Sequence, residues 1–363
     1  MHSMNNKGFA LSGISIVFMI IGILLISMAL IQVNNKYNEE KNTLYNTIKE
    51  KAVLDNTNSE YVTSTKGISF KEEASETNGR GVYIKSNTEN DENPIYYYRG
   101  KVENNNVIFA DFCWKIVRTT DTGGVKLIYN GKENDGKCSN TKTDSLISMK
   151  GFNIKSDDNA YVGYMYGETK STNYEKTHEN KNDSNIKKEI DSWYKKNIEE
   201  KGYSNKIEDT VWCNDRTVTF DDSGFGDTYT FYNSGSKIIL KEEEKISLEC
   251  PNKRDSFTTN EKNGNGNLTY PVALLTIDEA ILAGYSLNTG TSEENYLNIN
   301  ENWWLLSAYS YAGGATTQYI NSLNKLTSLY NFLEYGVRPS ISLKNDTIVT
   351  QGDGTELNPY IVK

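Results

Sequence analysis

Histidine is nearly absent from this sequence, and the site types that depend on it are excluded. The 363 residues include only His2 and His178, so a zinc site built from several histidines is excluded. Basic residues are also in deficit, with 39 Lys and Arg against 48 Asp and Glu. The resulting net charge of -9 would repel a phosphate backbone. We therefore expect no nucleic-acid partner.

The motifs of common enzymes are missing as well. Gly-x-Ser-x-Gly does not occur, and His178 lies in a charged stretch, residues 175–181, that predicts an exposed loop and not a general base. The acidic loop 221–227 has Tyr232 at the position of the bidentate glutamate of an EF-hand, so a solvated turn is favoured. We expect no enzymatic activity, no metal and no cofactor.

What the sequence does have is one long uncharged run. No charged residue occurs between Gly8 and Asn35, and a helix over Phe9–Val33, at about 1.5 Å per residue, crosses a hydrocarbon core of about 30 Å. A cleavable secretory signal ending near Ser27-Met28-Ala29 is the rival, although its apolar stretch would be unusually long. Lys7 before the run and an acidic chain after it predict a single-pass protein of the cell membrane. Its N-terminus is expected in the cytoplasm and its domain outside.

The start of that run resembles a type IV prepilin leader, in which a basic head ends in glycine and the mature chain begins with phenylalanine. The residues that carry the resemblance are Asn6-Lys7-Gly8-Phe9-Ala10-Leu11. The resemblance implies cleavage between Gly8 and Phe9 and pilin-like partners. It departs from the pilin pattern at Gly13, where pilins carry the glutamate associated with assembly. An ordinary uncleaved signal anchor is the alternative.

Four regions follow from these patterns. They are a cytoplasmic head or leader (1–8), a transmembrane helix (9–33), a helical stalk with a linker (34–66) and an extracytoplasmic domain (67–363). Leu44, Ile48 and Ala52 recur at helical spacing, so the membrane helix is expected to continue as the stalk. The polar residues 56–66 are expected to form the linker.

The domain itself has the patterns of an α+β fold, with antiparallel strands and two main helices. Ser184 and Gly202 bracket one amphipathic helix, and Thr276-Ile277-Asp278-Glu279 is the capping box of a shorter one. The turn Thr119–Gly124 predicts a hairpin. Strands are expected at 95–99, 107–109, 112–118, 125–129, 303–307, 318–320 and 337–343.

An ordered set of motifs in this domain resembles bacterial surface proteins with an exported C-type-lectin-like domain. That domain is related in its closing motif to the formylglycine-generating, sulfatase-modifying family. The motifs are Tyr98-Arg99-Gly100, Phe112–Arg118, Lys126–Gly131, Cys213–Arg216, Thr276–Ala280, Trp304–Ser307 and Gly336–Leu343. The resemblance implies a lectin-like fold from about residue 80 onward. It does not imply the oxidase activity, because no cysteine follows Cys250.

The aromatic residues are the strongest sign of binding. Trp303, Tyr309, Tyr311 and Tyr319 are the candidate ligand-binding residues, within a set that also includes Trp304, Tyr330, Phe332 and Tyr335. Flat rings stack on sugars or on apolar protein surfaces, so a glycan or a protein is the expected ligand. Core packing of the same rings is the alternative, since alternation is also typical of half-buried strands. Trp304, Val337 and Ile341 are assigned to the core.

The four cysteines, Cys113, Cys138, Cys213 and Cys250, all follow the uncharged run, and an even number in an oxidising compartment predicts disulfides. We expect the sequential pairs Cys113–Cys138 and Cys213–Cys250, which close the shorter loops. Together these patterns predict a membrane-anchored display or adhesion protein. A minor pilin-like subunit of a pilus or secretion machine is the alternative.

Overall fold

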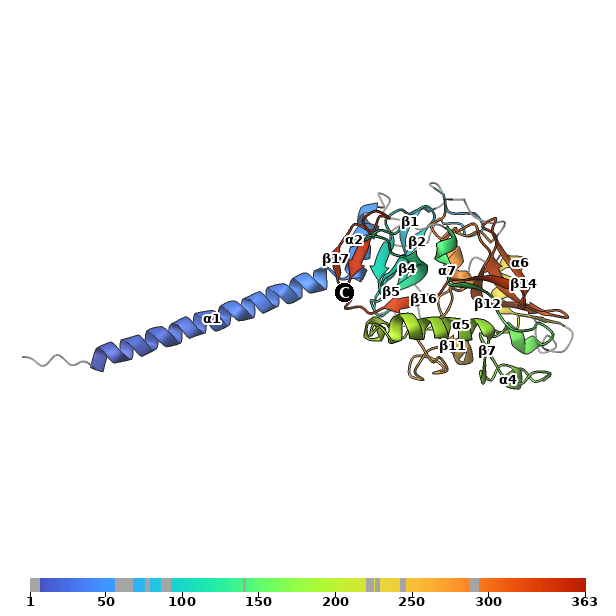
Figure 1. Cartoon of the computed structure of the whole chain (residues 1–363), viewed down its shortest axis with the longest axis horizontal. Helices are drawn as coiled ribbons and strands as arrows, with labels where there is room; N and C mark the ends of the chain where they lie inside the picture. Colours follow the sequence, from blue (N-terminus) through green and yellow to red (C-terminus); the bar gives the residue numbers. More distant parts are fainter. Residues whose placement is uncertain are drawn as a thin grey trace, which may run out of the picture.

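The computed structural model describes residues 7–55, 68–75, 79–85, 93–139, 142–219, 225, 229–241, 246–287 and 294–363. It consists of a long N-terminal helix and a domain of mixed helices and mostly antiparallel strands (Figure 1). The predicted α+β class is therefore confirmed.

Helix α1 (Lys7–Lys41) extends away from the domain (Figure 1). Its stretch Ile16–Val33 is apolar and long enough to cross a membrane, and none of it is buried against the rest of the chain. Exposed isoleucine, leucine and phenylalanine side chains on every face of a helix are unfavourable in water. A lipid environment would remove this cost.

The sequence pattern predicted that the membrane helix continues as the stalk, but the structure divides this region into two helices. The helix is interrupted at Asn42 and Thr43, and the Leu44 amide donates to the Thr347 carbonyl (2.8 Å). Helix α2 (Leu44–Asp55) then lies against the domain with Leu44, Ile48 and Ala52 fully buried. The apolar spacing that predicted a stalk is thus a docking face. The expected linker at 56–66 lies outside the described residues.

The larger sheet has eight strands and lies next to α2. Its order is β1-β2-β4-β3-β18-β17, with β5 pairing β4 and β16 pairing β5. The predicted hairpin is confirmed, since β4 and β5 pair antiparallel and Gly123 has a φ of 85° in their turn. The strands are β1 (Gly81–Lys85), β2 (Ile95–Arg99), β3 (Asn106–Phe109), β4 (Phe112–Thr119), β5 (Val125–Lys132), β16 (Ser340–Leu343), β17 (Val349–Gln351) and β18 (Tyr360–Val362).

The second sheet has six strands in the order β14-β13-β12-β15-β6, with β10 pairing β12. Its strands are β6 (Ser148–Gly151), β10 (Thr230–Phe231), β12 (Trp303–Tyr311), β13 (Ala315–Ile320), β14 (Leu326–Tyr330) and β15 (Glu334–Val337). Two short pairs complete the strands, β7 (Met165–Tyr166) with β8 (Asn182–Asp183) and β9 (Trp212–Cys213) with β11 (Ser256–Phe257).

The run 337–343, expected as one strand, is divided between the two sheets. Strand β15 ends at Val337 and β16 begins at Ser340, so Arg338 and Pro339 form the crossing. Proline has no backbone N–H and interrupts a ladder at this point. The buried Arg338 guanidinium lies 4.7 Å from the Trp303 ring centroid, and its Nη1 donates to the Leu297 carbonyl (2.8 Å). Its Nε donates to the Tyr129 carbonyl of β5 (3.3 Å), so Arg338 joins the two sheets.

Both predicted helices are present. Ser184 caps α5 (Asn185–Tyr194), which continues as a π-helical turn to Glu199, and Thr276 with Glu279 forms the complete capping box of α7 (Ile277–Leu282). The sequence did not predict α2, α4 (Tyr174–Thr177) or α6 (Asn233–Leu240) as helices of the domain. Single 3₁₀ turns occur at Lys142–Ser145, Asn159–Val162, Ser204–Lys206 and Lys253–Asp255.

The core and the disulfides agree with the sequence analysis. Trp304, Val337 and Ile341 are fully buried. Cys113 is bonded to Cys138 and Cys213 to Cys250, which is the sequential pairing. The second bond ties β9 to the segment around residue 250.

Candidate functional site

The six-stranded sheet lies at the end of the domain that is farthest from α1. Figure 1 shows α2, β17 and the C-terminus where α1 joins the domain, and α6, β12 and β14 at the opposite end. A domain held by α1 therefore presents this distal sheet farthest from the attachment point.

Three of the four candidate binding residues are buried on this sheet. The exposed fractions of Trp303, Tyr311 and Tyr319 are 1%, 9% and 8%. Tyr319 packs against Trp304 (5.8 Å between ring centroids), and Tyr311 belongs to a small apolar cluster with Tyr232. Both faces of β12 are covered, so the alternation along it does not leave one face open. These three residues therefore pack in the interior, as the alternative interpretation predicted. Of the four candidates, only Tyr309 is partly exposed.

The exposed rings of this end come mostly from other positions. We define the distal aromatic patch as Tyr229, Tyr309, Tyr330 and Phe332. Tyr229, Tyr330 and Phe332 are 52%, 43% and 50% exposed. The rings of Tyr330 and Phe332 are nearly parallel, with centroids 6.1 Å apart, and Tyr229 stacks in the same manner on Phe231 (6.3 Å). The patch thus presents ring faces to solvent.

Strand pairing explains why these rings share one face. Phe231 lies opposite Ser310, Ser310 opposite Thr316, and Thr316 opposite Tyr330, which makes one row across β10, β12, β13 and β14. Directly paired residues point to the same side of a sheet, and three strand spacings amount to about 14 Å. The row is about 14 Å long, and two of its members, Phe231 and Ser310, are buried, with exposed fractions of 4% and 7%.

The middle of that row is polar. The hydroxyls of Ser310 and Thr316 are hydrogen-bonded to each other at 3.0 Å. Tyr309, at the β-bulge of β12, meets Phe231 edge-on with centroids 5.3 Å apart. Burial raises the pKa of Tyr309, with Tyr229 adding to the effect and Ser328 opposing it, so its phenol stays neutral at physiological pH. The Thr316 hydroxyl also donates to the Ser310 carbonyl (2.9 Å), so the exposed rings, with their C–H-binding faces, are the main ligand contacts of the patch.

His178 does not lie in an exposed loop, which corrects the sequence-based interpretation. Its side chain is fully buried, with Nδ1 3.0 Å from the Tyr174 carbonyl oxygen and Nε2 3.2 Å from the Tyr232 hydroxyl. Burial, reinforced by nearby Arg216, holds the pKa of His178 well below its usual value. The imidazole is a neutral member of the interior.

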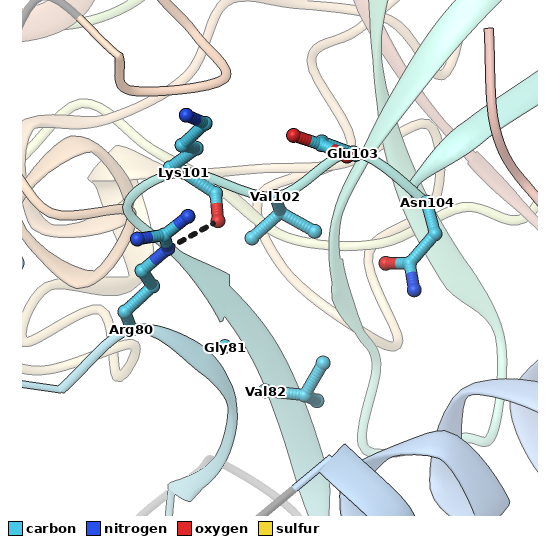
Figure 2. A pocket seen from close by; sticks show the side chains of 7 residues that line it. All are labelled: Arg80, Gly81, Val82, Lys101, Val102, Glu103 and Asn104. Carbon is cyan, nitrogen blue, oxygen red and sulfur yellow. Dashed lines mark hydrogen bonds between the residues drawn. The ribbon is translucent and has the colours of Figure 1, made fainter. Parts of the chain in front are cut away.

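A second hollow is a groove of about 450 Å³ beside β1 (Figure 2). Figure 2 shows Arg80, Val82 and Val102 bordering it, with the Arg80 Nε donating to the Lys101 carbonyl (3.1 Å). The Lys101 ammonium is paired with Glu294 at 2.7 Å. Because its cations have protein partners, this groove is a weaker candidate than the distal aromatic patch.

Two further expectations concern metals and the leader. Within the described ranges, no group of three or more His, Cys, Asp or Glu side chains is placed to hold a metal ion. The acidic loop 221–227 lies outside the described residues apart from Phe225.

Gly8 and Phe9, the predicted cleavage position of the leader, form part of the first turns of α1.

Comparison of the chain with protein-family models, with curated proteins and with solved structures finds no match. The site must be judged on its own geometry. Tyr330 and Phe332 belonged to the aromatic set of the sequence but not to its four candidates, and Tyr229 belonged to neither. The alternation of Tyr330 and Phe332 at the end of β14 was the sequence signal that could have identified these two residues.

Proposed function

We propose that this chain is a membrane-anchored extracytoplasmic display or adhesion protein that binds glycans and catalyses no reaction. The observation that carries the proposal is the distal aromatic patch, with three rings about half exposed at the end opposite α1. Ring faces stack on the C–H faces of sugars, so the exposed rings of Tyr229, Tyr330 and Phe332 supply the contacts for a short glycan.

The anchor in this proposal is α1, with Lys7 on the cytoplasmic side. The docking of α2 supports it, because the buried Leu44, Ile48 and Ala52 attach the end of the anchor firmly to the domain. The domain would then be held with a fixed side toward the membrane. The two disulfides suit an oxidising extracytoplasmic compartment.

A C-type-lectin-like fold is part of the proposal. It is supported by the position of the motif Gly336–Leu343, which crosses between the two mostly antiparallel sheets at Arg338 and Pro339. This closing motif is one of the seven that carry the lectin-like resemblance, and it lies where the two halves of the domain are joined. A ligand site at the distal end then belongs to the second sheet.

The test is a glycan-array screen of the full chain in detergent micelles, followed by the double variant Tyr330→Ala/Phe332→Ala. Loss of both exposed rings should weaken binding of the selected glycan by roughly 5- to 140-fold, on the basis of about 0.5–1.5 kcal/mol for each ring contact. The melting temperature should not change, since both rings are half exposed.

The matched control is Leu357→Ala, because Leu357 is 69% exposed and lies outside the patch. It should bind the glycan like the unmodified chain. Equal glycan affinity of the unmodified chain and the double variant, or a screen with no bound glycan, would contradict the proposal.

A minor pilin-like subunit is the second candidate, favoured by Lys7-Gly8-Phe9 at the start of α1. In that case the exposed surface of Ile16–Val33 would lie against other pilin helices as well as lipid. Mass spectrometry of the mature N-terminus separates the two candidates. A chain that begins at Phe9 indicates leader processing, whereas an intact leader indicates a signal anchor.

A further inference from the structure

A polar cleft of about 410 Å³ lies apart from the distal aromatic patch. It is bounded by the β4–β5 turn, the segment 208–211 and the end of β16, and no residue of the patch lines it. Ile95, Val211 and Leu248 give it one apolar wall. The remaining lining residues are Arg118, Thr120, Asp121, Thr122, Glu208, Asp209, Thr210, Lys262, Asn263 and Lys344.

The floor of this cleft holds an unbalanced charge. Oε1 of the buried Glu279 accepts from Arg118 Nε and from Lys126 Nζ, both at 2.8 Å. Burial alone would raise the pKa of Glu279, but Lys126 and Arg118 lower it to about 2. Burial lowers the pKa of Lys126 to about 8, which still leaves it largely protonated at neutral pH. These three side chains alone carry a net charge of about +1, and the chamber behind the cleft is also lined by the Lys237–Asp278 ion pair and by the carboxylates of Asp215 and Glu249.

Arg118 brings that charge to the cleft. Its side chain is nine-tenths buried; Nε donates to Glu279 and Nη1 donates to the Thr119 carbonyl (3.0 Å). Within the part of the chain that the structure describes, Nη2 has no hydrogen-bond partner. Arg118 lines both the cleft and a chamber of about 30 Å³ behind it, where Lys126 and Glu279 lie. Nη2 is reached by solvent, so it can donate to a ligand in the cleft.

Glu208 forms the wall of the cleft beside this charge. Its Oε2 accepts from the Thr120 hydroxyl (3.1 Å) and its Oε1 from the Thr122 hydroxyl. Burial raises the pKa of Glu208 to about 7, against the opposing effects of Thr120, Arg118 and Lys126, while Asp121 adds to the rise. The other charged residues of the cleft lining are Asp209, Lys262 and Lys344. Glu208 therefore neutralises the floor only in the fraction of molecules in which it is ionised.

We propose that this cleft binds a small organic molecule through one carboxylate, which pairs with Arg118 when Glu208 is protonated. The apolar wall contacts the carbon skeleton of the ligand, and the threonine hydroxyls remain donors to Glu208. A volume of about 410 Å³ accommodates a molecule the size of a monosaccharide or an amino acid. A sugar acid and a free amino acid share the required carboxylate. Repulsion between the ligand and ionised Glu208 makes binding weaker as pH rises through about 7.

The test is calorimetric titration of the full chain in detergent micelles with glucuronate, glutamine and glucose at pH 6 and pH 8. One or both carboxylates should bind at pH 6 and glucose should not; which of them binds identifies the source. If only the protonated form of Glu208 admits the ligand, the affinity should fall about tenfold between pH 6 and pH 8.

Glu208→Gln is the decisive variant, because the amide keeps the acceptor for Thr120 and cannot ionise. It should lose the tenfold pH dependence and keep at most the roughly twofold change that follows from half-deprotonation of Lys126 at pH 8. Arg118→Gln should abolish binding, but it also removes one of the two cations paired with Glu279, so the conclusion rests on Glu208→Gln. The double variant Tyr330→Ala/Phe332→Ala should bind the carboxylate normally, which separates this site from the glycan site. No carboxylate binding at pH 6, equal binding of glucose, or an undiminished tenfold pH dependence in Glu208→Gln would overturn the proposal.

Discussion

Replacement of Trp304 by alanine is expected to destabilise the domain by about 3–5 kcal/mol, the range for removal of a buried tryptophan. The ring is fully buried and packs against Phe152, Tyr319 and Tyr335, with centroids 5.9, 5.8 and 5.1 Å away. Its Nε1 also donates to the Lys150 carbonyl at 2.8 Å, so truncation leaves that carbonyl unpaired. Urea unfolding of the purified chain measures the loss.

Phe332→Ala is the control for this experiment, since it removes an aromatic ring that is 50% exposed on the same end of the domain. Its unfolding transition should stay close to that of the unmodified chain. If Trp304→Ala retained the midpoint of the unmodified chain and lost glycan binding instead, Trp304 would be a surface binding residue and the packing described for the second sheet would be wrong.

Replacement of Glu279 by glutamine is expected to cost about 3–5 kcal/mol, because it leaves Arg118 and Lys126 as buried cations without a counter-ion. Glutamine at this position can still accept from the Thr276 amide, so the capping box is retained and the charge alone is removed. Glu294→Gln is the control, because Glu294 pairs with Lys101 at the surface and its replacement leaves no buried charge without a counter-ion. A Glu279→Gln chain as stable as the Glu294→Gln chain would contradict the assignment.

The lowered pKa of Glu279 also determines how its contribution to stability depends on pH. The pKa of Glu279 is about 2 in the folded chain and 4.5 in the reference state, so its contribution is present above pH 4.5. As pH falls from 4.5 toward 2, both states become protonated and the contribution is lost. The difference in unfolding free energy between the unmodified chain and Glu279→Gln should therefore shrink over this interval.

Local signals in the sequence predicted local structure well. Gly123 allowed the turn of the β4–β5 hairpin, and Ser184 and Thr276 marked the starts of two helices, because capping and turn chemistry act within a few residues. Helix α6 was missed because its N-cap residue, Tyr232, makes no side-chain capping bond. The end of the stalk was mispredicted since nothing in the spacing of Leu44 and Ile48 indicates a docking partner.

The sites depend on contacts that are distant in sequence. Alternation along β12 indicated a strand but not that both of its faces are covered, so Trp303 and Tyr319 were taken for binding residues. Arg118 and Glu279 are 161 positions apart, and Glu279 read only as a capping residue. The residues of the Arg118–Lys126–Glu279 group and of the cleft above it become neighbours only in the folded chain. The sequence therefore predicted neither of them.

The central claim is that α1 holds the domain outside the membrane, with the distal aromatic patch directed away from it. Protease treatment of intact cells that lack an outer barrier tests this directly, with detection of the chain and of a cytoplasmic marker protein. We predict that the domain is digested while the cytoplasmic marker stays intact. A domain that remains protected until the cells are lysed, or that is recovered from the cytosol, would contradict the claim.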